Sequence, residues 1–160
     1  MSITIRPITQ RDQRKLAQLI RSVFKEYRAP LENTVYDDQK TWHIYDSLQG
    51  VNAQYWVIDN DGEIVGGCGF YPTEGLPDGY AELVKFYFSP KIRGLGFGSR
   101  ILRQVIEEAQ NAGYEKLYIE SFPEFSAAIG IYLRHGFYHI PERLGNSTHT
   151  ATSIFMLLDI

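Results

Sequence analysis

The residues with the clearest chemical potential lie in a glycine-rich stretch, residues 88–99, just past the middle of the chain. Gly94, Gly96 and Gly98 follow Arg93 there and precede a helical pattern. Glycine lets backbone amides approach a ligand without interference from a Cβ atom. A helix N-terminus adds unpaired N–H groups and partial positive charge. The stretch therefore predicts a site for an anion such as a pyrophosphate.

Several phosphate-binding patterns compete for this stretch. A P-loop needs a lysine and then Ser or Thr after its last glycine, whereas Gly98 is followed by Ser99 and Arg100, which excludes it. A dinucleotide fingerprint needs Gly-x-Gly-x-x-Gly in an early βαβ unit, and the spacing here is Gly-x-Gly-x-Gly. An acidic residue, Glu115 or Glu120, does follow at a suitable distance, so this alternative stays open. A glycine-rich turn without a ligand is a further alternative.

The elements that must position this stretch follow from hydrophobic periodicity and from turn residues. Strands are expected over residues 3–8, 55–58, 63–71, 81–88, 116–121, 137–140 and 153–158. Helices are expected over residues 10–27, 37–48, 97–112 and 126–134. The order β-α-α-β-β-β-α-β-α-β-β predicts an α/β (α+β) fold with a mixed sheet and helices on both faces. The length suits one domain over residues 1–160.

The glycine-rich stretch, the element order and two other segments resemble a known family. Arg93, Gly96 and Gly98 fit Arg-x-x-Gly-x-Gly, which resembles the coenzyme A pyrophosphate loop of the GCN5-related N-acetyltransferase (GNAT) superfamily. The element order is similar to the GNAT acyl-CoA N-acyltransferase fold over nearly the whole chain. Residues 82–94 and the Leu-Gly-Asn run at 144–146 resemble a subgroup of small, uncharacterised bacterial acetyltransferases. The resemblance implies that the fourth and fifth strands splay apart and that pantetheine lies in the gap.

A candidate proton donor comes from the same resemblance. Residues 127–137 are similar to the second GNAT signature, roughly Ala-x-x-Leu-Tyr-Glu-Lys-x-Gly-Phe. By that match Tyr132 would protonate the coenzyme A sulfur, although a core tyrosine with a satisfied hydroxyl is the alternative. The family often carries an Asn cofactor contact seven residues earlier, where this chain has Phe125. The loop around Phe125 must therefore contact the cofactor differently.

Two glutamates are candidates for the base that deprotonates the acceptor amine. Glu82 opens an aromatic strand at the position of the base in the histone acetyltransferase branch. Glu120 lies twelve residues before Tyr132, where the ribosomal-protein N-terminal acetyltransferase branch carries its base. A glutamate against aromatic neighbours can have a raised pKa, which favours Glu82 slightly. A solvated strand-end carboxylate is the alternative for either residue, and an ordered water could also relay the proton.

The resemblance also implies cofactor contacts made by the backbone. The strand segment of Phe86, Tyr87 and Phe88 would pair with the pantetheine amides like an added strand, and one N–H there would polarise the thioester carbonyl. Arg93 or Arg100 could add charge. The amides expected to hold the pyrophosphate are those of Gly94, Leu95, Gly96, Phe97, Gly98 and Ser99.

Composition narrows the class of protein. The net charge is −3 with signs interspersed, which indicates no nucleic-acid surface. No signal peptide and no apolar run of membrane-spanning length is visible, so a cytoplasmic protein is expected. The single cysteine, Cys68, excludes an intramolecular disulfide, and the four histidines show no metal spacing. His149 lies in a polar loop that the resemblance places near the acceptor.

The resemblance implies an N-acetyltransferase that moves the acetyl group of acetyl-CoA to a primary amine of a small molecule or amino acid. The amine would attack directly within a ternary complex, without a metal. An amino-acid acceptor would need an arginine, such as Arg28 or Arg143, for its carboxylate. The alternatives are a protein N-terminal or lysine acetyltransferase and a non-catalytic acyl-CoA-binding module. The sequence leaves the acceptor, the acyl-chain preference and the oligomeric state open, and homodimers are common in the family. Aromatic residues that could line an acceptor pocket are Tyr27, Tyr36, Trp42 and Tyr71.

Overall fold

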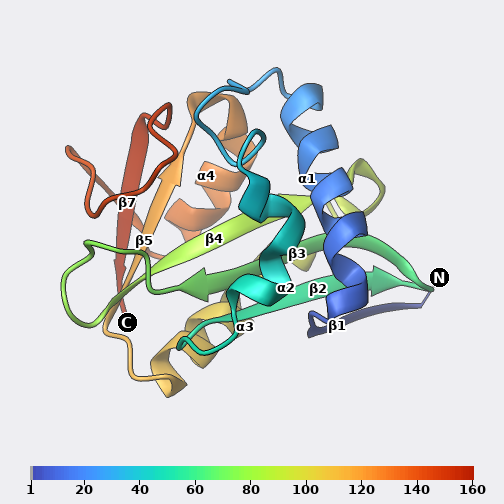
Figure 1. Cartoon of the computed structure of the whole chain (residues 1–160), viewed down its shortest axis with the longest axis horizontal. Coiled ribbons are helices and arrows are strands. Elements are labelled where there is room, and N and C mark those ends of the chain that lie inside the picture. Colours follow the sequence, from blue (N-terminus) through green and yellow to red (C-terminus); the bar gives the residue numbers. More distant parts are fainter. Residues whose placement is uncertain (1) are drawn as a thin grey trace.

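The computed structural model describes residues 2–160, and the strands within them form one mixed sheet in the order β1-β2-β3-β4-β5-β7-β6 (Figure 1). Those strands are β1 (Ile3–Pro7), β2 (Gln54–Asn60), β3 (Glu63–Tyr71), β4 (Tyr80–Phe88), β5 (Lys116–Ser121), β6 (Tyr138–Ile140) and β7 (Ile154–Asp159). The α-helices are α1 (Gln13–Glu26), α2 (Ile44–Ser47), α3 (Phe97–Asn111) and α4 (Ser126–Arg134). The mixed α/β class and the element order expected from the sequence are confirmed.

Helices cover both faces of the sheet, as expected. The apolar stripe of α1, which includes Leu16, Ile20 and Phe24, is fully buried in a core shared with α2. The stripe of α3, which includes Ile101 and Val105, is buried in a second core on the opposite face. Figure 1 shows α1 and α2 in front of the sheet and α3 behind it. None of the helices within residues 2–160 has the length and apolarity that a membrane crossing needs.

Strands β4 and β5 separate partway along their length. They pair in parallel over three positions only, from Tyr80 with Lys116 to Glu82 with Tyr118. Beyond that point β4 continues to Phe88 without this neighbour, while β5 stays paired with β7. The expected splay of the fourth and fifth strands is thus present, and it opens the sheet at the carboxyl ends of a parallel pair, where ligands favour binding.

A β-bulge in β4 lies beside this opening. The register of β3 and β4 shifts between Gly67 and Gly69, so one residue of β3 lies opposite both Lys85 and Phe86. Lys85 has φ +53°, in the left-handed region that side chains other than glycine rarely adopt. The Tyr55 hydroxyl donates a 2.6 Å hydrogen bond to the Lys85 carbonyl oxygen and so stabilises the bulge.

The glycines of β3 leave the space that Tyr55 needs to reach the bulge. A Cβ atom at Gly67 would lie 2.6 Å from the Tyr55 Oη and 2.7 Å from its Cε1. The Tyr55 ring is buried and cannot move aside easily. Close packing against this ring therefore explains Gly67 and Gly69 of β3, whereas a Cβ at Gly66 would instead lie 2.8 Å from Phe88 Cδ1.

We expect Gly67→Ala to lower the free energy of unfolding by roughly 1–3 kcal/mol, because overpacking forces the Tyr55 ring or the bulge to shift. Urea denaturation measures this. Gly130→Ala in α4 is the matched control, since its Cβ would meet its nearest neighbour at 3.4 Å and alanine favours a helix. Equal stabilities of the two variants would contradict this explanation.

The prediction of one continuous helix over residues 37–48 is wrong. Residues 37–48 form a 3₁₀ segment, Gln39–His43, followed by the short α2, rather than a continuous helix. His43 between them has φ −131° and ψ 40°, outside the helical region. The Thr41 hydroxyl donates to the Val35 carbonyl oxygen, which holds the 3₁₀ segment against the preceding loop. Such side-chain to backbone bonds compete with regular helix.

Candidate active site

A cavity of about 1050 Å³ lies where β4 and β5 separate. One end is lined by the glycine-rich loop between β4 and α3, including Gly94 and Gly96. The other end is lined by Glu82 and by two loops that contribute Asp38 and His149. A single cavity therefore joins the predicted pyrophosphate loop to the predicted base, and we call these two ends the loop end and the acceptor end.

The loop end has open space in front of its backbone. Gly94 and Gly96 have φ +77° and +86°, and a Cβ atom at either position would meet no atom within 4 Å. Gly96 is the N-cap of α3, so no side chain caps the first amides of this helix. These amides, with the positive end of the helix dipole, suit a phosphate group that occupies the space a Cβ would fill.

Arg93 stabilises the loop rather than pointing free into the cavity. Its guanidinium donates to the carboxylate of Glu26 at 2.5 and 2.9 Å and to the Phe88 carbonyl oxygen at 2.8 Å. It also lies over the ring of Tyr27, 4.9 Å from the centroid. The hydrogen bond from Arg93 favours the ionised form of Glu26 and lowers the pKa of that carboxyl. Arg93 thus connects α1 to the end of β4 while it borders the cavity.

We expect Gly96→Ala to raise the KM for acetyl-CoA at least about tenfold, equivalent to about 1.4 kcal/mol, because the new methyl group fills the space for the phosphate. Steady-state kinetics measures this. Gly113→Ala, just beyond the other end of α3, is the matched control because its φ of +96° imposes comparable strain in open space. An equal rise in KM in both variants would contradict binding at Gly96.

Tyr132 meets the cavity from α4. Its ring is buried against the rings of Phe86 and Phe137, at centroid distances of 5.1 and 5.6 Å. The hydroxyl makes no hydrogen bond to any of residues 2–160, yet it is not sealed off, since no unpartnered side-chain oxygen there is fully buried. Burial raises the pKa of Tyr132 well above its usual value. The phenol is therefore protonated and free to donate into the cavity.

Glu82 lies at the last paired position between β4 and β5, at the acceptor end. Burial raises the pKa of its carboxyl to about 7, although a 2.5 Å hydrogen bond from the Thr73 hydroxyl works in the opposite direction. The nearby charge of Glu120 also raises this pKa. A carboxyl with a pKa near neutrality can accept a proton and release it again under the same conditions.

Glu120 also borders the cavity but is engaged by the protein. Its side chain is 2% exposed, and its Oε1 accepts hydrogen bonds from Arg143 at 2.7 Å and from the Thr152 hydroxyl at 2.9 Å. The Tyr118 hydroxyl donates to the other oxygen at 2.8 Å. An arginine and two hydroxyls thus occupy the Glu120 oxygens, whereas Glu82 accepts a side-chain hydrogen bond from Thr73. The Glu82 carboxylate is therefore the more available of the two to a ligand in the cavity.

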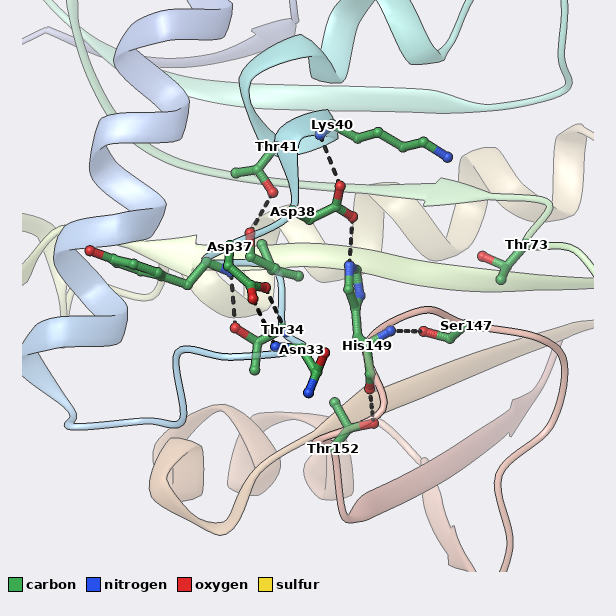
Figure 2. A network of polar contacts seen from close by, with 12 residues as sticks. Asn33, Thr34, Asp37, Asp38, Lys40, Thr41, Thr73, Ser147, His149 and Thr152 are labelled. Atoms are coloured by element: carbon green, nitrogen blue, oxygen red, sulfur yellow. Dashed lines mark hydrogen bonds and ion pairs between the residues drawn. The ribbon is translucent and has the colours of Figure 1, made fainter.

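Two loops far apart in the sequence meet above the acceptor end (Figure 2). The His149 imidazole lies 2.8 Å from the Asp38 carboxylate, and the Ala151 amide donates to the Asn33 carbonyl oxygen at 3.2 Å. Burial opposes ionisation of Asp38, but hydrogen bonds from His149 and from the Lys40 amide outweigh it and lower the pKa of Asp38. The loop after α1 and the loop before β7 are thereby joined.

The Leu-Gly-Asn run has a structural role in the same region. The Leu144 amide donates to the Tyr118 hydroxyl at 3.0 Å, and the Asn146 amide donates to the Glu74 carbonyl oxygen at 2.8 Å. Gly145 between them has φ +73°. The run therefore joins the loop before β7 to the loop between β3 and β4, so three loops surround the acceptor end.

Nearly all residues predicted from the sequence line this cavity. The three candidate catalytic residues Tyr132, Glu82 and Glu120 do so, as do Phe86, Tyr87, Phe88, Arg93, Gly94, Gly96, Phe97, Gly98, Ser99 and Phe125. Leu95 does not, and its side chain is exposed, which leaves only its backbone amide available.

Phe125 and the other aromatic candidates divide between cavity and core. Phe125 is buried edge-on against Phe24 and Tyr27, so it offers an apolar wall where the family often has Asn. Tyr27 and Tyr71 line the cavity. Tyr36 and Trp42 stack instead with the Arg21 guanidinium.

Sequence reasoning missed three polar residues of the acceptor end, namely Thr73, Asp38 and Lys85. Thr73 and Asp38 lie in loops without a distinctive pattern. Lys85 did carry a signal, because a lysine within an aromatic strand needs a polar environment for its ammonium group. Metal-ligating side chains do not gather in groups of three or more anywhere in residues 2–160.

Comparisons with known proteins agree with this geometry. The sequence model of the acetyltransferase (GNAT) family matches residues 16–137. The chain is 32% identical to the uncharacterized N-acetyltransferase YjgM of Escherichia coli over 99% of this chain and 96% of that protein.

Solved structures show the same fold. A GNAT-family acetyltransferase from Staphylococcus aureus superimposes with a TM-score of 0.84 at 21% identity over 99% of both chains. The PaiA N-acetyltransferase of Thermoplasma acidophilum, solved in complex with coenzyme A, gives a TM-score of 0.78 at 17% identity over 100% of both chains. With the family match over most of its length, the chain belongs to the acetyltransferase (GNAT) family.

Proposed function

We propose that this protein transfers the acetyl group of acetyl-CoA to a primary amine of a small molecule or amino acid. The observation that carries the proposal is the single cavity that joins uncapped helix amides at Gly96 to Glu82 and the free hydroxyl of Tyr132. Acetyl-CoA supplies an acetyl group activated as a thioester. The loop end fits its pyrophosphate, and the unpaired part of β4 beyond Glu82 offers backbone groups to its pantetheine arm.

The proposed roles of the residues follow the needs of acyl transfer. Glu82 accepts the proton of the amine, directly or through one water, as a new N–C bond forms at the carbonyl carbon. Backbone N–H groups at the β4 bulge stabilise the negative charge that develops on the carbonyl oxygen. As the C–S bond breaks, the Tyr132 hydroxyl gives its proton to the sulfur. Glu120 is the second candidate base.

The form of the acceptor end supports a small acceptor. Three loops surround this end and are fastened to one another by the Asp38–His149 hydrogen bond and by backbone hydrogen bonds at Ala151 and Asn146. Fastened loops leave a cavity with defined walls, which suits a compact amine, whereas a protein tail would need an open channel.

Thiol release from acetyl-CoA, followed with a chromogenic thiol reagent over a panel of amines, amino acids and short peptides, tests the proposal. The enzyme adds little background, because its single cysteine, Cys68, is buried and burial raises the pKa of its thiol. We expect release that depends on a small amine. Release with peptides alone would indicate a protein acetyltransferase. Binding of acetyl-CoA without release over the whole panel would contradict the proposal and indicate a binding module.

A further inference from the structure

Two lysines face the acceptor end without a partner. Lys85 and Lys40 both line the cavity. Neither ammonium group forms a hydrogen bond or ion pair with the part of the chain that the structure describes, and the Lys85 ammonium is not sealed from the cavity. Figure 2 shows Lys40 extending away from Asp38 toward the side of the view that holds Thr73, the hydrogen-bond donor to Glu82.

The acidic groups nearby do not pair with either lysine within residues 2–160. Both oxygens of Asp38 accept hydrogen bonds, one from the Lys40 backbone amide and one from His149. Glu120 is paired with Arg143. Glu82 and Glu74 also line the cavity, and in the proposed reaction Glu82 receives a proton. Neither lysine ammonium therefore has a hydrogen-bonded counterion within residues 2–160, and protonation of Glu82 removes one of the negative charges that act on Lys85.

The backbone shows that the position of Lys85 is built into the fold. In a regular strand Lys85 would share a face with Ala81 and Leu83, which are buried in the core under α3. The bulge inserts Lys85 as an extra residue and turns it toward the cavity, at the cost of a left-handed φ. Tyr55 holds this arrangement through the Lys85 carbonyl oxygen.

The electrostatic environment of Lys85 favours binding of an anion next to its ammonium group. Burial lowers the pKa of its ammonium, and Lys40 lowers it further, while the charges of Glu82 and Asp38 act in the opposite direction. A partly buried ammonium without a hydrogen-bonded partner is unfavourable, and an anionic ligand would relieve it.

We propose that Lys85, assisted by Lys40, binds an anionic group of the acceptor, so that the enzyme selects amines that also carry a carboxylate or a phosphate. The inference rests on the proposed function and names the substrate class of its acceptor end. Lys85 follows Glu82 by three residues, roughly 10 Å of extended strand before the bulge is counted. An amine at Glu82 and an anion within reach of the flexible lysine suit a compact molecule such as an α-amino acid.

The arginines considered from the sequence do not fill this role. Arg143 donates to Glu120 and to the carbonyl oxygens of Thr150 and Thr152, which occupies its guanidinium. Arg28 is exposed and does not line the cavity. Lysines bind anions as point charges and need not meet them in a fixed planar geometry.

Matched pairs of acceptors test the selection. Amino acids are compared with their carboxamides, and phosphoethanolamine with ethanolamine, so that each pair keeps its amine and differs in the anion. We expect kcat/KM at least about tenfold higher for the anionic member, equivalent to about 1.4 kcal/mol. Whether the carboxylate or the phosphate pair shows the larger ratio identifies the anion. Ratios near one in every pair would overturn the inference.

Variants of Lys85 assign the selection to a residue. In Lys85→Gln we expect the ratio of kcat/KM between the anionic acceptor and its neutral partner to fall at least about tenfold, because an effect on Glu82 is common to both acceptors and cancels in the ratio. Lys85→Arg, which keeps the charge, should restore much of the preference. Lys15→Gln on the exposed surface of α1 is the control. An undiminished preference in Lys85→Gln would overturn the inference.

A binding measurement separates this inference from the proposed function. Calorimetry with N-acetylglycine needs no turnover, and we expect its affinity to fall at least about fivefold in Lys85→Gln, or about 1 kcal/mol. Lost affinity together with no acetyl transfer to any amine would support the anion site and overturn the proposed function. Transfer by an enzyme whose affinity for N-acetylglycine does not depend on Lys85 would do the reverse.

Discussion

Replacing Tyr132 by Phe is expected to lower kcat by about 10²-fold, the range typical of a lost general acid, with the KM for acetyl-CoA nearly unchanged. The reason lies in the hydroxyl, which reaches the cavity but bonds to none of residues 2–160. Its removal leaves the ring packing against Phe86 and Phe137 intact. Steady-state kinetics with saturating acetyl-CoA measures the loss.

The same substitution should leave the melting temperature unchanged, because it removes no hydrogen bond from the folded chain. Tyr138→Phe is the matched control, since that hydroxyl lies on the surface and donates to Asp159. An active Tyr132→Phe enzyme with wild-type kcat would show that a water or another group protonates the sulfur.

Replacing Glu82 by Gln is expected to lower kcat/KM by about 10²-fold or more, because the variant loses the group that accepts the proton of the amine. In the wild type, activity should rise with pH through a midpoint near 7, the pKa of Glu82, since only the ionised carboxylate is a base. The rise should be absent in Glu82→Gln. Glu107→Gln, on the exposed face of α3, is the control.

Thr73→Val refines this assignment. The Thr73 hydroxyl lowers the pKa of Glu82 by donating to its carboxylate, so its removal should move the midpoint of the pH profile upward. A removed contact elsewhere in the fold would not produce such a shift. A midpoint that stays in place would instead point to Glu120 or to the amine itself as the titrating group.

Glu82→Gln should stabilise the folded protein at alkaline pH, although it lowers the activity. The pKa of Glu82 in the folded chain lies near 7, above the value of about 4.3 of an unfolded glutamate. The stability that the protonated Glu82 contributes is therefore present below about pH 4.3 and is lost as the pH rises from there to about 7. The variant should melt at a higher temperature than the wild type at alkaline pH while it is less active. A base held in an unfavourable environment has this signature.

Local patterns in the sequence predicted the loop end and most of the fold. The spacing of Gly94, Gly96 and Gly98 before an amphipathic helix reflects a need of the backbone itself, so it is visible without the rest of the chain. Tyr132 was found because its helix matches a family signature. The strands were predicted from alternation and from turn residues, which are also local.

The acceptor end was less predictable because distant segments build it. Asp38 and His149 are 111 residues apart, and neither neighbourhood indicates that they pair. The alternation of a regular strand would place Lys85 on the face opposite Glu82, and the bulge that reverses this depends on packing between β3 and Tyr55. The expected helix over residues 37–48 failed for a related reason, since bonds to a neighbouring loop shape that segment.

The most direct test of the central claim is a single-turnover reaction analysed by mass spectrometry. Enzyme in excess over acetyl-CoA is mixed with an amino acid that supports thiol release, and the acceptor and the intact protein are both weighed. Direct transfer predicts one acetyl group on the acceptor amine for each coenzyme A released, and an unmodified protein when the amine is omitted. Coenzyme A released without an acetylated amine, or an acetylated protein that forms before transfer, would contradict it.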